Sequence, residues 1–238
     1  MSFFPHKKNS ETAIDLVLCV DNTGAHAPIH HELARHAPEL IETILECINE
    51  YGSVEKDRLR IKVIRFKDYC IDADPMEESP FFSIDDPSGK KQFFDFLNSF
   101  HSCGGGDEPE SSLEALVTAI RSDWKPRGAH YRQIIVLFTD ATPHNLGDEF
   151  SIQSPLYPAG MPKDFAELTR IWEEGDKDFA PHFNPRRARL ILFAPAVVDT
   201  WRTIGYTWDR AMWVQVDAGL GCSDVDTVYA WQVIASAI

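Results

Sequence analysis

The strongest constraint on the fold is an alternation of short apolar runs with longer segments of helical spacing. The apolar runs are rich in β-branched and aromatic residues and lie at Ile14 to Val20, Ile61 to Phe66, Ile134 to Phe138, Leu190 to Phe193 and Trp213 to Val216. Runs of this length and composition are typical of strands that are buried on both faces of a parallel sheet. Parallel strands need crossover connections, and these are usually helices.

The segments between these runs carry apolar residues at helical spacing. The longest covers Ile29 to Tyr51 and ends before Gly52, a common helix stop. We expect further helices at Lys90 to Phe100, Glu110 to Ser122, Phe165 to Glu174 and Val225 to Ile238. A short run at Phe81 to Ile84 is expected to add an antiparallel edge strand. The pattern predicts an α/β fold with a doubly wound, mostly parallel central sheet flanked by helices.

Composition narrows the class of protein. The 238 residues are 44% hydrophobic and 25% charged, which is typical of a globular chain. We expect residues 1–12 to be an N-terminal tail and residues 13–238 to form a single domain. A formal net charge of -14 disfavours binding to nucleic acid or to an anionic membrane surface. Without an apolar run of the roughly 18 residues that a membrane helix needs, a cytoplasmic location is expected.

Three aspartates are expected along one rim of the sheet. Ligands of doubly wound folds bind outside the carboxyl ends of the strands. Asp21 ends the first strand in CVDNTG, Asp140 follows a later strand in FTDATPH, and Asp107 lies in the loop SCGGGDEPES before a helix. Aspartate is also a common turn and N-cap residue. Together with the hydroxyl of Thr23, however, the three carboxylates form a set of hard oxygen ligands.

These motifs resemble the metal-ion-dependent adhesion site of the von Willebrand factor A (vWA) domain family. That family has D-x-S-x-S after its first strand, and the matching positions here are Asp21, Thr23 and Ala25. The resemblance implies that Asp107 supplies the ligand of the glycine-rich loop and that Asp140 supplies the aspartate after the fourth strand. It extends from about Ile14 to the C-terminus. The forms GGGDEPES and FTDATPH look most like bacterial intracellular vWA proteins found beside tellurite-resistance genes and MoxR-type ATPases.

One position departs from the family pattern. Ala25 stands where the family has a serine whose hydroxyl binds the metal directly. A water molecule would then replace that oxygen, so the resemblance implies a weak site. A hard oxygen set with mobile waters favours Mg²⁺, with Mn²⁺ as a laboratory substitute.

The resemblance also implies a function. It suggests an interaction module whose bound ion accepts a carboxylate from a protein partner, within a bacterial stress, metal-resistance or defence system. An ATPase, kinase or phosphatase of the same operon is the expected kind of partner, and no catalytic residue is expected.

Alternative interpretations of the same residues remain. The sequence DNTG is similar to the D-K-T-G motif of aspartyl-phosphate enzymes, so Asp21 could instead be the nucleophile of a Mg²⁺-dependent phosphatase or phosphotransferase. His26 and His30 have the spacing of a zinc pair, but a solvated helix start is the favoured interpretation. His144 could face the metal rim, although an exposed loop position is favoured. The long segment Ala141 to Pro162 is expected to lie over the rim.

Overall fold

The computed structural model describes residues 11–51, 56–100, 104 and 108–238 and contains one seven-stranded sheet. The strand order is β3-β2-β1-β5-β6-β7, and β4 also pairs with β2. The strands are β1 (Thr12–Asp21), β2 (Leu59–Phe66), β3 (Met76–Glu78), β4 (Phe82–Ser83), β5 (His130–Phe138), β6 (Ala188–Pro195) and β7 (Ala211–Val216). Neighbours among β1, β2, β5, β6 and β7 are parallel, whereas β3 and β4 run antiparallel to β2.

Six α-helices are present among the described residues, with bounds α1 (Ala27–Tyr51), α2 (Pro87–Asn98), α3 (Ser112–Ile120), α4 (Phe165–Glu174), α5 (Asp199–Thr207) and α6 (Thr227–Ser236). Two short 3-10 helices, η1 (Gly24–His26) and η2 (Ser151–Gln153), lie in loops. The doubly wound α/β prediction is therefore confirmed. The sequence pattern missed β3 and α5, and it anticipated the antiparallel strand β4.

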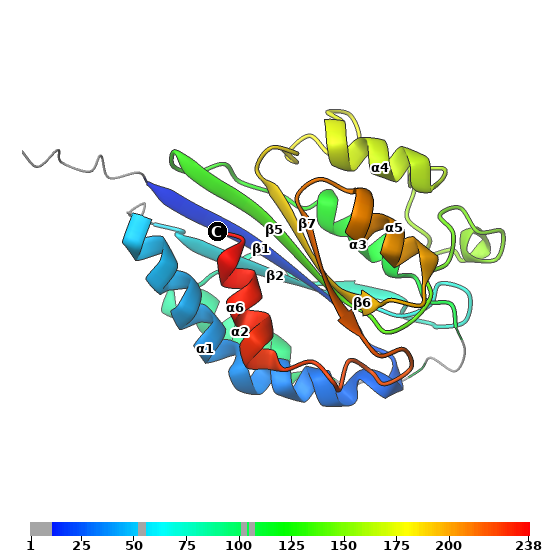
Figure 1. The fold of residues 1–238 in the computed structure, drawn as a ribbon, viewed down its shortest axis with the longest axis horizontal. Helices are drawn as coiled ribbons and strands as arrows, with labels where there is room; N and C mark the ends of the chain where they lie inside the picture. The colour runs from blue at the N-terminus through cyan, green and yellow to red at the C-terminus, as the bar shows by residue number, and fades with distance from the viewer. Residues whose placement is uncertain (1–10, 52–55, 101–103, 105–107) are drawn as a thin grey trace, which may run out of the picture.

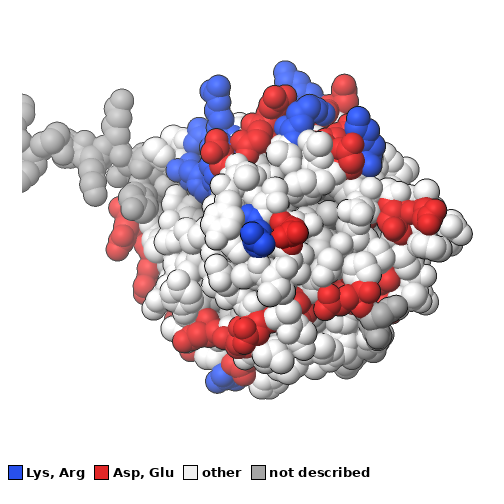
Figure 2. All heavy atoms as spheres, turned by 45° about the vertical axis from the view of Figure 1, so that its right-hand side comes forward, with Lys and Arg blue, Asp and Glu red and all other residues white. Residues whose placement is uncertain are grey.

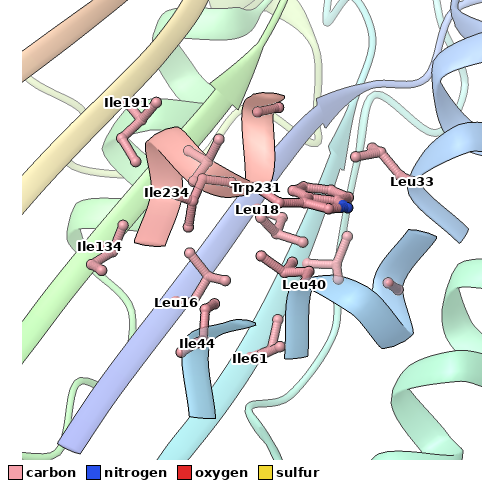
Figure 3. Close-up of a cluster of buried hydrophobic side chains, with 14 of the residues drawn as sticks. Leu16, Leu18, Leu33, Leu40, Ile44, Ile61, Ile134, Ile191, Trp231 and Ile234 are labelled. Atoms are coloured by element: carbon pink, nitrogen blue, oxygen red, sulfur yellow. The ribbon is translucent and has the colours of Figure 1, made fainter. Parts of the chain in front are cut away.

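The sheet is the middle of three layers (Figure 1). Helices α1, α2 and α6 lie on one face and α3, α4 and α5 on the other, and each set packs on its own core cluster. In Figure 3 the α1 side chains Leu40 and Ile44 and the α6 side chain Trp231 meet the β1 residues Leu16 and Leu18. All ten residues of β1 are buried, as expected for a central strand covered on both faces.

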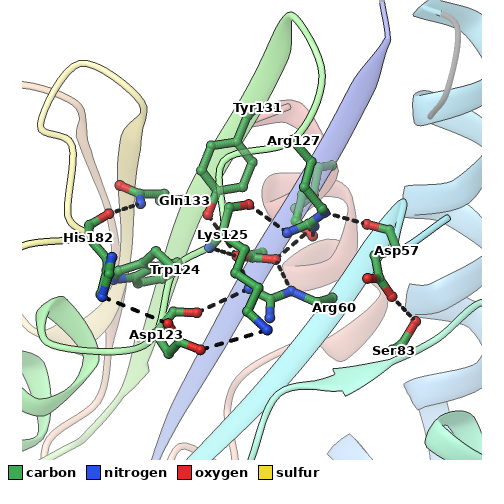
Figure 4. A network of polar contacts seen from close by, with 12 residues as sticks. Asp57, Arg60, Ser83, Asp123, Trp124, Lys125, Arg127, Tyr131, Gln133 and His182 are labelled. Carbon is green, nitrogen blue, oxygen red and sulfur yellow. Dashed lines mark hydrogen bonds and ion pairs between the residues drawn. The ribbon is translucent and has the colours of Figure 1, made fainter.

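A buried ionic network lies at the end of the sheet where β1 begins (Figure 4). Asp15 is fully buried, and its carboxylate accepts hydrogen bonds from the guanidinium of Arg60 at 2.8 and 2.5 Å and from the hydroxyl of Tyr131 at 2.7 Å. Arg127 approaches the same carboxylate to 2.8 Å. Two guanidinium groups and a hydroxyl offset the desolvation of this charge. The network lies at the amino end of β1, opposite the rim where Asp21 lies.

The surface follows the acidic composition. On the face drawn in Figure 2, acidic side chains are spread widely, while basic ones gather mainly along the upper edge. Within the part of the chain that the structure describes, no helix combines the length and apolar character that crossing a membrane requires.

Candidate metal site at the sheet rim

The topology brings Asp21 and Asp140 together. Strands β1 and β5 are parallel neighbours, with Val20 opposite Phe138, so the residues that follow emerge at the same edge. Asp21 is fully buried and Asp140 is 3% exposed. The ligand atoms of these two carboxyl groups lie within 4.8 Å of each other. Two buried carboxylates at that separation require a cationic or hydrogen-bond donor group between them. The expected convergence of these two strand ends is present in the structure.

The imidazole of His26 fills that role. The backbone N–H of Thr23 donates to Asp21 Oδ1 at 2.9 Å, and the N–H of His26 donates to the carbonyl of Thr23 at 3.0 Å. This tight turn, which contains η1, folds His26 back over the end of β1. Its Nδ1 lies 3.2 Å from Asp21 Oδ1 and 2.9 Å from the hydroxyl of Thr23, and its Nε2 lies 3.0 Å from Asp140 Oδ1. One ring therefore contacts both carboxylates.

The pKa shifts of the three groups follow from this contact. Burial raises the pKa of Asp21, and the contacts with His26 and Thr23 only partly offset it. Burial acts against the charged form of His26, but contact with Asp140 and Asp21 outweighs it and raises the pKa of the imidazole. Burial also acts on Asp140, whose pKa is nevertheless lowered by His26 and by the Gly221 N–H. The two carboxylates therefore favour the imidazolium form of His26 between them.

The loop after β7 holds Asp140 from the other side. The N–H of Gly221 donates to Asp140 Oδ2 at 2.5 Å, and the N–H of Gly219 donates to the Asp140 carbonyl at 3.2 Å. Gly221 has a φ of 61°, and a Cβ there would lie 1.9 Å from the carbonyl oxygen of Ala25. Glycine is therefore required where this loop packs against the loop that carries the metal-site motif. Nothing in the sequence indicated this contact.

An open pocket of about 320 Å³ lies beside these groups. Its lining is made of Asp21, Thr23, Gly24, Ala25, Gly104, Glu108, Glu110, Asp140, Ala141 and Gly219. Ala25 is exposed and lines this pocket, at the position where the family pattern has a serine. The N–H of Gly24 donates to the Gly104 carbonyl at 3.2 Å, so this part of the glycine-rich loop does approach closely. Asp107, predicted as a ligand, lies outside the described residues.

The donor set suits a divalent cation. Asp21, His26 and Asp140 each offer a ligand atom, and these atoms lie within 4.8 Å of one another. Asp21 Oδ2 is buried and has no hydrogen-bond partner among the described residues. A buried carboxylate oxygen in that state is costly, and a bound cation would satisfy it. Sequence reasoning identified Asp21, Thr23 and Asp140 but did not include His26.

The structure corrects what was expected of the histidines. The solvated helix start is wrong, since His26 and His30 are 1% and 3% exposed. They do not form a zinc pair either. His30 Nε2 lies 2.6 Å from the backbone carbonyl of Asp21, and burial lowers its pKa to about 4, so the neutral ring donates to that oxygen. The sequence did not indicate the burial of either ring, because both histidines lie in a segment rich in polar residues.

The segment Ala141 to Pro162 also differs from expectation. Of its described residues, only Ala141 lines the rim pocket. Further along, the hydroxyl of Tyr157 donates to Glu114 at 3.1 Å, and Arg121 donates to the carbonyl of Ala159 at 3.2 Å. The segment therefore lies mainly over α3 rather than over the rim. His144 is not an exposed loop residue, because its side chain is only 11% exposed and lies 3.1 Å from Asp68.

Comparisons with known proteins support the fold. No family model matches the chain, and no curated protein matches it. Among solved structures, the chain is similar to the pilus adhesin SpaC from Lactobacillus rhamnosus GG, with a TM-score of 0.56 and 10% identity over 95% of this chain and 31% of that one. It is also similar to proximal thread matrix protein 1 from the mussel byssus, with a TM-score of 0.51 and 9% identity over 96% of this chain and 49% of the other. The chain thus spans less than half of each protein, and at these identities the likeness shows the fold alone.

Proposed function

We propose that this chain is a vWA-type interaction module that binds a protein partner through a divalent cation at the sheet rim. The observation that carries the proposal is the meeting of Asp21 and Asp140 on one imidazole, at 3.2 and 3.0 Å, beside an open pocket. Buried carboxylates of two neighbouring strands that share a single cationic group have the charge arrangement of a cation site. Both residues line the rim pocket, which leaves one side of the site open to a partner.

The roles of the residues follow from their positions. Asp21 and Asp140 would supply carboxylate oxygens, Thr23 would supply its hydroxyl, and His26 would either add a nitrogen or move aside. With few charged ligands the ion keeps its preference for an external anion, which a carboxylate of the partner would provide. Mg²⁺ is the proposed ion, with Mn²⁺ as its laboratory substitute. Because Ala25 offers the ion no hydroxyl, water would complete the coordination.

For the partner we propose a class of protein. The resemblance of the motifs to bacterial intracellular vWA proteins favours an ATPase, kinase or phosphatase encoded in the same operon, in a stress, metal-resistance or defence system. The structurally similar proteins are an adhesin and a matrix protein. Both names fit binding or assembly better than catalysis.

A pull-down followed by mass spectrometry tests the proposal. Wild-type protein in Mg²⁺ should enrich a partner that Asp21→Ala and added chelator both lose. Asp209→Ala is the matched control, because Asp209 is exposed and precedes β7 at the opposite edge of the sheet. A partner retained equally by Asp21→Ala would contradict a role for the rim.

The same proteins separate this function from the phosphatase alternative. The binding module should not turn over ATP or generic phosphate esters. Steady hydrolysis that disappears in Asp21→Asn but persists in Asp209→Ala would instead make Asp21 a nucleophile.

A further inference from the structure

A second cluster of ligand-type side chains lies in two loops that start at the same edge of the sheet. Asp68 and Cys70 follow β2, and His144 follows β5. Asp68 is 3% exposed, and Cys70 and His144 are partly buried. None of the three lines the rim pocket described above. We propose that Asp68, Cys70 and His144 form a separate metal site, built for Zn²⁺ or a similar transition-metal ion.

The distances between the ligand atoms carry this proposal. Cys70 Sγ lies 3.5 Å from His144 Nε2, and that nitrogen lies 3.1 Å from Asp68 Oδ1. In tetrahedral zinc sites, bonds of about 2.3 Å to sulfur and about 2.0 Å to nitrogen and oxygen place sulfur and nitrogen roughly 3.5 Å apart and nitrogen and oxygen roughly 3.3 Å apart. All three atoms lie within 4.8 Å of one another. The spacing is that of the edges of a coordination tetrahedron.

The identity of the nitrogen separates a metal site from a catalytic triad. In a triad the histidine uses one ring nitrogen toward the nucleophile and the other toward the carboxylate. Here Nε2 is the atom close to both Cys70 and Asp68. A single nitrogen cannot relay a proton between the two groups, but it can join them in binding one ion. Burial also raises the pKa of the Cys70 thiol, which is unlike an activated nucleophile.

The surroundings orient the ligands. The N–H of Cys70 donates to Asp68 Oδ1 at 2.8 Å, which fixes the turn that carries both residues. The hydroxyl of Ser151 lies 3.3 Å from Cys70 Sγ, and Asp148 Oδ1 lies 4.0 Å from the same sulfur. Asp148 Oδ1 already accepts the N–H groups of Phe150 and Ser151, so a water molecule would complete the coordination. Two carboxylates around one thiol and one imidazole give the cluster the negative charge that attracts a divalent cation.

The site would connect the loop after β2 with the loop after β5. The N–H of His144 donates to the Glu110 carbonyl at 2.9 Å, and Glu110 itself lines the rim pocket. An ion held by Asp68, Cys70 and His144 would therefore fix one wall of that pocket. Its ligand chemistry differs from that of the rim, because thiolate and imidazole select Zn²⁺ whereas carboxylate and hydroxyl select Mg²⁺ or Mn²⁺.

Cobalt substitution of the full chain tests the proposal. Co²⁺ added to metal-free protein should give a thiolate-to-cobalt charge-transfer band that Zn²⁺ abolishes at one equivalent. Cys70→Ser should lose this band, while Cys47→Ser, on α1 and away from the cluster, should keep it. Asp21→Asn should also keep it, which separates this site from the rim.

A second measurement covers the possibility that a variant folds poorly. Competition with a coloured chelator should show that His144→Gln weakens Zn²⁺ binding by more than about 100-fold, since even residues that only support zinc ligands cost about 10- to 100-fold. His31→Gln, which changes an exposed histidine of α1, should bind as wild type does. A band that survives in Cys70→Ser, or equal Zn²⁺ affinity in a well-folded His144→Gln, would overturn the proposal.

Discussion

The Nε2 atom of His26 lies 3.0 Å from Oδ1 of Asp140, although the two residues follow different strands. The other ring nitrogen faces Asp21 at 3.2 Å, so a single imidazole stands between the two proposed metal ligands. A cation that binds both carboxylates must compete with the imidazole of His26 for them. Proton release and metal binding should therefore be linked at this rim.

The first prediction concerns pH. The carboxylates raise the pKa of His26, so a bound metal favours loss of the ring's proton: a coordinating ring must be neutral, and a ring that moves aside loses the contacts that raise its pKa. Mn²⁺ affinity should rise as the pH increases from about 6 to about 8. Calorimetric titration measures this slope. In His26→Gln the slope above about pH 6.5 should flatten, and an identical slope in both proteins would remove His26 from the linkage.

The second prediction concerns the loop that holds Asp140. Gly219 and Gly221 both have positive φ, at 72° and 61°, but a Cβ at Gly219 meets nothing within 4 Å whereas one at Gly221 meets the Ala25 carbonyl. Gly219→Ala should cost about 1 kcal/mol of stability from backbone strain alone. Gly221→Ala should cost more than about 2 kcal/mol and should also weaken Mn²⁺ binding. Urea unfolding of the pair decides this, and equal losses would mean that the close approach to Ala25 is not rigid.

The third prediction concerns Glu114 in α3. Burial, and to a lesser degree Asp68 and Asp148, raise its pKa to about 7, against the hydrogen bond from Tyr157. Its folded pKa lies above its unfolded value, so the folded state holds a proton that the unfolded state has lost. Stability should therefore fall as the pH rises from about 4.5 to about 7 and change little above that, by an amount on the order of 3 kcal/mol.

Glu114→Gln isolates this effect. The variant should lose the fall between those pH values and should exceed wild type in stability at about pH 8. Glu42→Gln, which changes an exposed residue of α1, is the control and should keep the wild-type slope. Chemical unfolding at several pH values provides the measurement. A wild-type slope in Glu114→Gln would show that another group titrates.

The fourth prediction concerns Ala25. Its side chain is exposed and lines the rim pocket, so a hydroxyl placed there can reach a bound ion without disturbing the core. Ala25→Ser should tighten Mn²⁺ binding by several-fold, on the order of 1 kcal/mol, because a neutral ligand replaces a water. Unchanged affinity would mean that the ion does not approach this position.

The parallel sheet could be predicted because its strands are apolar runs whose burial leaves a clear pattern. The convergence of Asp21 and Asp140 followed from the rule that strand ends share an edge. The sequence pattern missed two elements, β3 and α5, for physical reasons. Strand β3 is Met76–Glu78, with two acidic residues that pair with Arg65 and Lys62 of β2 rather than filling a core. Helix α5 is short and buries only Trp201 and Ile204, too few apolar positions to show a period.

The rim itself was only partly predictable. Thr23 and Asp21 belong to one local motif, but the place of His26 depends on a tight turn whose residues have no distinctive signature. The contact of Gly221 with Asp140 joins the loop after the edge strand β7 to the loop after β5, which lies nearer the centre of the sheet. Contacts of that range arise from tertiary packing and not from local sequence preference. For the same reason Cys70 and His144, from separate loops, could not be paired in advance.

A titration of metal-free protein with Mn²⁺ decides whether a cation binds between Asp21 and Asp140. Wild-type protein should bind an ion at the rim. Asp21→Asn and Asp140→Asn should each lose that ion, because each substitution removes a negative charge as well as a carboxylate oxygen. Asp209→Ala should bind as wild type does. Both rim variants should bind one Mn²⁺ fewer than wild type and the control. Equal binding by all four proteins would show that the cation does not lie between Asp21 and Asp140.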